Sequence, residues 1–318
     1  MSPPRIVDNP HAEAAEKALS YLKELSASLD GWTFSSEYKG TSVYTRAVEG
    51  LAIPITRGDV VLRNGTEHKF TIEQVAAVCT SPGARTQWDD RFESAEQKEY
   101  YNHHEALFYS KLKGQWPVVY GRDIAGVFTR EESPDCIYIA MCSVEDSRIP
   151  EDSSYVRANL YISGWKISTL KPEDDEEGQG GIRISYIVHV DVNGYLPSAF
   201  VSAVQLQTPL CAGRVCNYLI KNGFTPFIAD TNAVPTLQEF DHEDKMSVFK
   251  LDASAAASKG EEGFVKIIAS KQMYADGLFV KANGEGATVE ESDGEHDDRI
   301  ITIKGFKGVV TVSIIPEE

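Results

Sequence analysis

Five segments between residues 99 and 190 are rich in β-branched and aromatic residues, and polar or glycine-containing stretches separate them. This composition is typical of β-strands. The five segments cover residues 101–109, 123–129, 137–143, 156–162 and 182–190. A run of this kind predicts an antiparallel sheet as the centre of the fold.

Helical patterns lie on both sides of this run. Leucines recur at helical spacing over residues 11–30. Residues 71–74 form a capping box that opens a second helix, and this helix should end at the Pro-Gly pair that follows. A longer helical pattern covers residues 197–222, where Pro209 and Gly213 interrupt it. An interior proline costs a helix about 3 kcal/mol, so we expect a kink or a short break there.

The last part of the chain has a different character. Residues 229–245 contain Pro235 and read as a linker. Residues 246–318 hold short strand-like segments that Gly-rich and acidic turns separate, which predicts a small β-rich domain.

The net charge of −17 limits the partners of the chain. Nucleic acids select basic surfaces, so no nucleic-acid partner is expected. Anionic lipid headgroups also attract Lys and Arg, so we expect membrane contact to be transient. The sequence predicts no oligomeric state.

The five cysteines show no CxxC spacing, so the sequence predicts no metal site, and it points to no cofactor. The N-terminus lacks the apolar region of a secretion signal, and no run of about 18 apolar residues is present. We therefore expect a cytoplasmic protein with reduced thiols.

Short motifs in a fixed order give a more specific indication. They are Arg85, Trp88 and Asp89 after the second predicted helix, Arg122 and Asp123 at the start of a strand, Ser143, Pro150 and Arg157 around a loop, and residues 185–187 with 191–197 before the last helix. Taken together, residues 32–222 resemble a START (steroidogenic acute regulatory protein-related lipid-transfer) domain.

The resemblance implies an α+β helix-grip fold, in which a long C-terminal helix closes a curved antiparallel sheet around a lipid tunnel. It implies a soluble carrier or sensor of one lipid that uses neither a metal nor a redox cofactor. Residues 197–220 and 143–154 would act as the lid. Residues 1–228 would then form the START-like lipid-binding domain, followed by the linker 229–245 and the β-rich domain 246–318.

Strand alternation suggests which side chains face the tunnel. On one strand the odd-numbered residues from 101 to 109 share a face, and on the next strand the even-numbered residues from 122 to 130 do. Together with the closing helix, the predicted lipid-binding residues are Tyr101, His103, Glu105, Tyr109, Arg122, Ile124, Phe128, Arg130, Met141, Arg157, Tyr186, Phe200, Val204, Thr208, Ala212 and Val215.

Glu105 is the predicted polar anchor, because a buried carboxylate needs a partner. Arg122, Arg130 or Arg157 would supply it, and the pair would hold a lipid hydroxyl or headgroup. The alternative is that Glu105 faces solvent or closes a structural salt bridge. Cholesterol carriers of the family have a basic residue near the position of Phe128, so this chain departs from the simplest sterol site.

Two further features have competing interpretations. The small residues Thr208 and Ala212 either leave volume for a wide lipid or pack directly on the sheet. His103 and His104 are adjacent, and on a strand they would point to opposite faces and not share a metal. We therefore predict structural roles for both histidines.

The predicted function is non-enzymatic binding and transfer of one lipid of the sterol or phospholipid class, with no catalytic residue. One alternative is a lipid-responsive interaction protein, in which the β-rich tail binds a partner or covers the tunnel mouth. An enzyme on the same fold, such as an aromatase/cyclase, ranks last because no nucleophile–base pair is readable.

Overall fold

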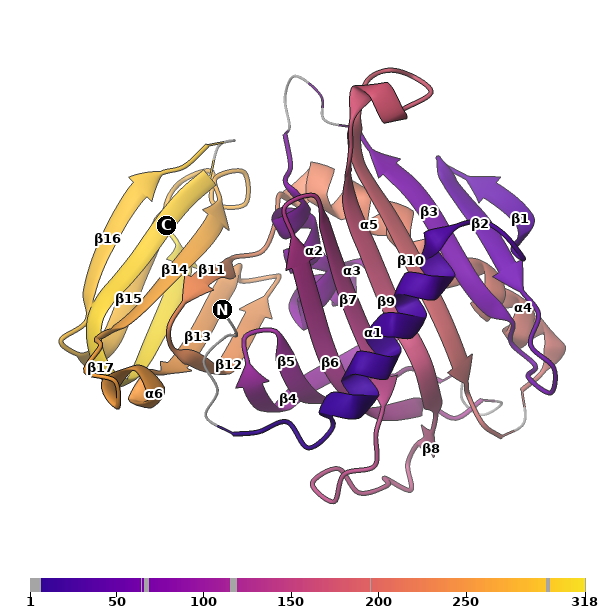
Figure 1. Cartoon of the computed structure of the whole chain (residues 1–318), viewed down its shortest axis with the longest axis horizontal. Helices are drawn as coiled ribbons and strands as arrows, with labels where there is room; N and C mark the ends of the chain where they lie inside the picture. The colour runs from indigo at the N-terminus through magenta and orange to yellow at the C-terminus, as the bar shows by residue number, and fades with distance from the viewer. Residues whose placement is uncertain are drawn as a thin grey trace.

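A ten-stranded sheet forms the larger part of the molecule, and a smaller all-β region lies at one edge of it (Figure 1). The structure is a computed structural model that describes residues 7–63, 65, 69–114, 119–194, 196–295 and 298–317. The strand order of the large sheet is β1-β2-β3-β10-β9-β7-β6-β5-β4, and the short β8 joins β6. All pairs are antiparallel except β6 with β8. The predicted α+β fold class, with a curved sheet and a second β region, is confirmed.

The strands of the large sheet span most of the first two thirds of the chain. They are β1 (Thr33–Tyr38), β2 (Thr41–Arg46), β3 (Ile55–Leu62), β4 (Phe92–Asn102), β5 (Glu105–Leu112), β6 (Arg122–Ser133), β7 (Cys136–Ser143), β8 (Val156–Arg157), β9 (Asn159–Leu170) and β10 (Gly181–Asp191). A single 3₁₀ turn, Pro172–Asp174, lies in the connection from β9 to β10.

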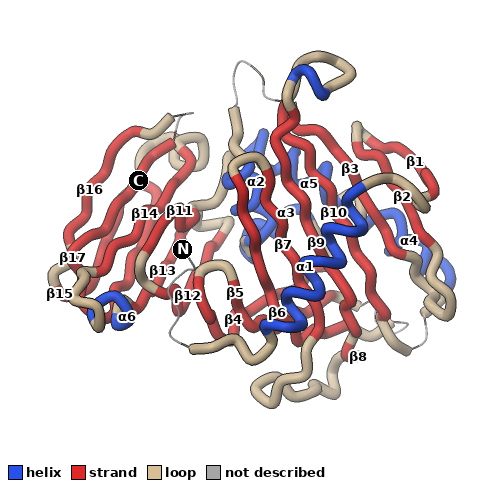
Figure 2. The backbone as a smooth tube through the Cα atoms, in the orientation of Figure 1, coloured by secondary structure: helices blue, strands red, loops and turns tan. Residues whose placement is uncertain are grey.

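Helices cover both faces of this sheet (Figure 2). Helix α1 (Ala12–Ala27) lies on one face, where its buried side chains pack against β6, β7 and β9. On the other face lie α2 (Ile72–Thr80), α3 (Pro82–Trp88) and α5 (Cys211–Asn222), which share the main core with the sheet. Helix α4 (Ser198–Gln207) precedes α5 and is buried only at Val204.

The capping box that opens α2 is present as predicted. Thr71 accepts a hydrogen bond from the Gln74 amide, and the Gln74 side chain accepts one from the Thr71 amide. Pro82 lies at the start of α3 rather than simply ending a helix, because a proline fits the first turn, where its missing N–H is not needed.

The predicted break in the closing helix separates α4 from α5 at residues 208–210. The break packs on β3 at Gly58, where an added Cβ would lie 2.0 Å from the Pro209 carbonyl oxygen. A glycine is therefore required at this crossing.

The segment predicted as one strand from 101 to 109 is instead a hairpin. Strand β4 ends at Asn102 and pairs with Glu105 at the start of β5, so His103 and His104 form a two-residue turn. The His104 amide donates to the Asn102 side chain at 2.7 Å, which supports the turn. Tyr101, Leu107 and Tyr109 still pack together, as the predicted alternation requires. The face that joins the core with α2, α3 and α5 is instead the one that carries Phe108.

The C-terminal region contains two strands that the sequence reading assigned to a linker. Its elements are β11 (Phe227–Thr231), β12 (Val234–Asp241), β13 (Met246–Asp252), α6 (Ser254–Ala257), β14 (Gly263–Ser270), β15 (Leu278–Glu285), β16 (Thr288–Asp293) and β17 (Asp298–Pro316). Strand β17 pairs with β13, β14, β15 and β16. Most of 229–245 is therefore part of this β region.

Candidate functional site

A cavity of about 470 Å³ lies between the large sheet and the C-terminal β region. Its walls come from α2 and α3, from strands β4 to β7, and from β11 to β14 with the start of β17. Pockets of roughly 300–1,000 Å³ are typical of small-molecule sites. The cavity is thus shared by two parts of the chain that are far apart in sequence.

Most of the cavity wall is apolar. Strands of the large sheet and of the β region contribute Phe92, Ala106, Phe108, Phe128, Met141, Phe227, Ile228, Phe240, Phe249 and Ile268. Many of these side chains also belong to the main hydrophobic core or pack against it. The cavity is therefore an extension of the core, and water inside it would find few partners along this part of the wall.

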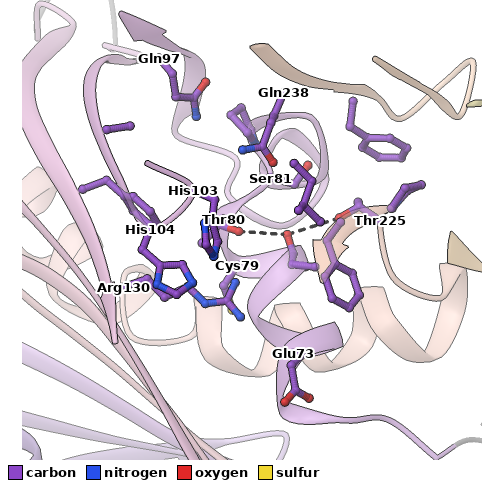
Figure 3. A pocket seen from close by; sticks show the side chains of 18 of the residues that line it. Glu73, Cys79, Thr80, Ser81, Gln97, His103, His104, Arg130, Thr225 and Gln238 are labelled. Atoms are coloured by element: carbon purple, nitrogen blue, oxygen red, sulfur yellow. Dashed lines mark hydrogen bonds between the residues drawn. The ribbon is translucent and has the colours of Figure 1, made fainter. Parts of the chain in front are cut away.

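The polar end of the cavity lies at the hairpin between β4 and β5 (Figure 3). Arg130 forms an ion pair with Glu132, and His104 Nε2 lies 3.7 Å from Glu132 Oε1. The rings of His103 and His104 have their centroids 4.0 Å apart. Glu73 of α2 also lines this end of the cavity and stabilises the charged form of Arg130.

Burial keeps the two imidazoles neutral. Desolvation and the neighbouring His104 together lower the pKa of His103 to about 4. Desolvation and the nearby Arg130 also lower the pKa of His104 to about 4. Among the described residues, the buried Nδ1 of His103 has no hydrogen-bond partner. A neutral imidazole offers one donor and one acceptor, so this end can recognise a hydroxyl or a carbonyl group.

Small hydroxyl side chains line the wall next to α2. Thr80 and Thr225 both donate to the Ala77 carbonyl, at 3.4 and 3.3 Å, as the dashed lines in Figure 3 show. Cys79 lies on the same helix, and desolvation raises the pKa of its thiol well above the usual value. This thiol is therefore protonated near neutral pH and is a weak nucleophile.

Four of the predicted lipid-binding residues line this cavity: His103, Phe128, Arg130 and Met141. The prediction for the even-numbered face of β6 therefore agrees with the structure at its cavity end. Ile124 and Tyr186 lie in the core beside the cavity, where the Tyr186 ring stacks on Trp165 at 4.0 Å.

Tyr101, Glu105 and Tyr109 lie on the opposite face of the sheet from the cavity. Tyr101 packs with Ile149 of the loop after β7, and Tyr109 donates to Asp123 at 3.0 Å. The cavity side of β5 is formed by its even-numbered residues Ala106, Phe108 and Ser110.

The three arginines predicted as partners of Glu105 each make other contacts. Glu105 accepts a hydrogen bond from Asn9 at 3.1 Å. Arg157 binds Asp123 at 2.9 Å, and Arg122 donates to backbone carbonyls, including that of Val192 at 3.0 Å. Arg130, paired with Glu132, is the guanidinium of the predicted trio that reaches the cavity.

The closing helix contributes no side chain to the wall of this cavity as described. Ala212 and Val215 are fully buried in the main core, where α5 packs on the sheet. Thr208 donates to the Val204 carbonyl at 2.7 Å and accepts from Arg91 at 2.6 Å. Phe200 lies on α4, half-buried. Of the two interpretations of the small residues, the structure shows direct packing on the sheet.

Sequence reasoning missed the contributions of α2, α3, β4 and the C-terminal strands. Gln97 and Tyr100 reach the cavity from β4, and Gln238 and Phe240 reach it from β12. The capping box predicted where α2 begins, but it did not indicate that α2 lines the cavity. Only the suggestion that the tail covers the tunnel mouth pointed toward the wall formed by the β region.

Two kinds of feature were not found among the described residues: a metal site and a membrane-spanning helix. Within the described ranges, no group of three or more His, Cys, Asp or Glu side chains is arranged to hold a metal ion. No helix in the same ranges is long and apolar enough to cross a membrane.

Comparison with solved structures shows the same fold in two human proteins. Human STARD10 matches with a TM-score of 0.53 at 18% identity, covering 68% of this chain and 81% of that one. Human StAR-related lipid transfer protein 5 matches with a TM-score of 0.55 at 17% identity, covering 66% of this chain and 96% of that one.

Sequence relatives come from bacteria and plants. An uncharacterised protein of Pseudomonas aeruginosa is 26% identical over 186 residues, covering 58% of this chain and 84% of the relative. The Arabidopsis thaliana protein ENHANCED DISEASE RESISTANCE 2-like is 24% identical over 202 residues, and only 28% of its length is matched. The model of the START domain matches residues 12–212. This match covers more than half of the chain, which therefore belongs to the START domain family.

Proposed function

We propose that this protein binds one lipid in the cavity between the large sheet and the C-terminal β region and transfers it between membranes without catalysis. The observation that carries the proposal is a mostly apolar cavity with a polar end, in a chain of the START family. Apolar walls bury the hydrocarbon, and a few polar groups fix its orientation.

The polar end favours a lipid whose head is uncharged and carries a hydroxyl or a carbonyl. Both guanidiniums in the described lining are already paired, Arg130 with Glu132 and Arg85 with Asp89. The described lining includes no lysine, and four of its side chains are carboxylates: Glu73, Glu132, Glu239 and Asp298. A phosphate would therefore meet net negative charge. A sterol-like or other hydroxyl-bearing lipid fits better than an anionic phospholipid.

The proposal of a non-enzymatic role rests on the state of the ionisable groups. A cysteine nucleophile needs a thiolate and a base that can carry a proton. Cys79 has a raised thiol pKa, and His103 has a lowered one, so the ion pair of a thiolate with an imidazolium is disfavoured. The site can bind and orient a ligand, which is sufficient for transfer.

The test is to fill the cavity from one strand. Ala106 is buried on β5 and lines the cavity, so Ala106→Trp should occupy the ligand volume. Lys98 lies on β4 with its ammonium near the outward-facing Tyr109 ring, so Lys98→Trp places the same side chain on the other face.

Native mass spectrometry of both purified variants and the parent would measure co-purified lipid. We expect Ala106→Trp to lose at least about nine tenths of the bound lipid and Lys98→Trp to keep it. Equal loading of the two variants, with circular dichroism confirming that both are folded, would refute the site.

A further inference from the structure

Helix α5 is built into the core, which argues against its opening as a lid. Cys211, Ala212, Val215 and Leu219 are each 0% exposed. A Cβ added at Gly213 would lie 2.2 Å from the Thr41 hydroxyl oxygen, so the helix sits directly against β2. Swinging α5 outward would expose this entire apolar face to water, which the hydrophobic effect strongly opposes.

The opposite side of the cavity is closed by a more polar seam. Gln97 and Tyr100 on β4 face Gln238 on β12, and all three side chains are only half-buried. Tyr100 and Gln238 share a hydrogen bond. Figure 3 shows Gln97 and Gln238 on two separate segments in the upper part of the view. When this seam parts, its polar groups can exchange their hydrogen bonds for water, so breaking these contacts costs less than exposing the apolar face of α5.

The chain itself provides a hinge for this opening. Residues 223–226 form the direct connection from α5 to the β region, and Gly223 ends α5 with φ at +77°. On the hinge side, Thr225 donates to the Ala77 carbonyl of α2 at 3.3 Å. Gln74 of α2 donates to both carboxylate oxygens of Asp298, at 2.9 and 3.0 Å. These contacts hold the β region to α2. The contact between β4 and β12 is made by other residues of the cavity wall.

We infer that the C-terminal β region is the moving wall of the ligand site, and that lipid enters and leaves between β4 and β12 while α5 stays fixed. This inference rests on the proposed function. It assigns to the β region a direct role in ligand exchange, because β11 to β14 supply one wall of the cavity.

The test locks the seam with the ligand inside. A variant with Gln97→Cys and Gln238→Cys is joined by a short bifunctional thiol reagent, and each single variant treated with the same reagent is a control for reaction at native cysteines. Release of the co-purified lipid into phosphatidylcholine vesicles is followed by native mass spectrometry. We expect the locked protein to release its lipid at least about tenfold more slowly than either single variant.

A matched lock tests the alternative lid. Tyr38 of β1 and Leu206 of α4 are exposed and line one surface hollow, so Tyr38→Cys with Leu206→Cys pins α4 to β1 in the same way. We expect this lock to leave the release rate unchanged.

Release that is unaffected by the β4–β12 lock, or slowed equally by both locks, would overturn the inference while leaving the proposed function in place. A parent protein without any bound lipid would instead contradict the proposed function, and the inference would fail with it.

Discussion

Phe128 and Arg130 lie two residues apart on the cavity face of β6 and line an apolar and a polar part of the site, respectively. Phe128 makes its part of the wall apolar, and Arg130 carries its charge to the hairpin, where Glu132 neutralises it. The departure from a basic residue at Phe128 therefore moves the polar end along the strand instead of removing it. The ligand head should lie near His103 and His104.

The two turn histidines should make the stability of the protein depend on pH. Their pKa values are lowered from 6.5 to about 4 in the folded state, so between these values the unfolded chain binds more protons. Stability is therefore lost as the pH falls from about 6.5 toward 4, at about 1.4 kcal/mol per pH unit for each imidazole. The neutral, folded form is favoured above that window.

We expect the free energy of unfolding of the parent to fall by roughly 2 to 4 kcal/mol more between pH 7 and pH 5 than that of a variant with His103→Gln and His104→Gln. Urea unfolding at both pH values measures the difference. The same pH dependence in parent and variant would show that the imidazoles titrate normally.

At this scale the sequence predicted the cavity face of β6 but not that of β5. Alternation along β6 placed Phe128 and Arg130 on the cavity side. At residues 101–109 it grouped the odd-numbered residues correctly but assigned them to the cavity, and the two-residue turn carries no Gly or Asn at its centre to mark it. The contact of Glu105 with Asn9 could not be predicted, because the two residues lie 96 positions apart in the chain.

At the scale of elements, the break between α4 and α5 can cross β3 closely because residue 58 is a glycine. Gly58 gives the Pro209 carbonyl room to lie against the strand. Pro209 predicted the break, but nothing in the sequence indicated that Gly58 would receive it. Contacts between distant elements of this kind are set by the assembled fold rather than by local pattern.

Gly58→Ala should therefore destabilise the protein. An inserted Cβ would overlap backbone, which cannot move aside as a flexible side chain does. We expect a loss of about 1 to 3 kcal/mol, as in overpacked cores. Chemical denaturation measures it, and an unchanged midpoint would mean that residues 208–210 do not rest on β3.

At the scale of the whole molecule, the net charge of −17 is not offset by a basic patch at the loop 143–154. Arg148, the loop's cation, is bound by Asp146 at 2.6 Å and by Glu99, and it also donates to the Tyr101 hydroxyl at 3.1 Å. Its charge is already neutralised within the protein.

Lipid transfer should consequently not increase with anionic lipid in the membrane. We expect the rate of transfer of co-purified lipid between vesicles to change less than about twofold when roughly a third of the phosphatidylcholine is replaced by phosphatidylserine at low salt. A rise of tenfold or more would reveal a basic contact surface that the folded charge distribution does not suggest.

The division of the chain at residues 228 and 245 stays a prediction, although the strands change how it should be drawn. Prolines made 229–245 read as a linker, yet Val234 and Pro235 lie in β12, which pairs with β13 at one edge of the sheet. Edge strands tolerate proline because one row of their amides has no partner strand. Composition alone could not distinguish an edge strand from a linker.

Strand β17 has a consequence for the order in which the protein is made. It pairs with four strands that precede it in the chain, so a ribosome releases all of those strands before the one that joins them. The wall of the cavity that β13 and β14 help to form therefore cannot be completed until the last strand of the chain is available.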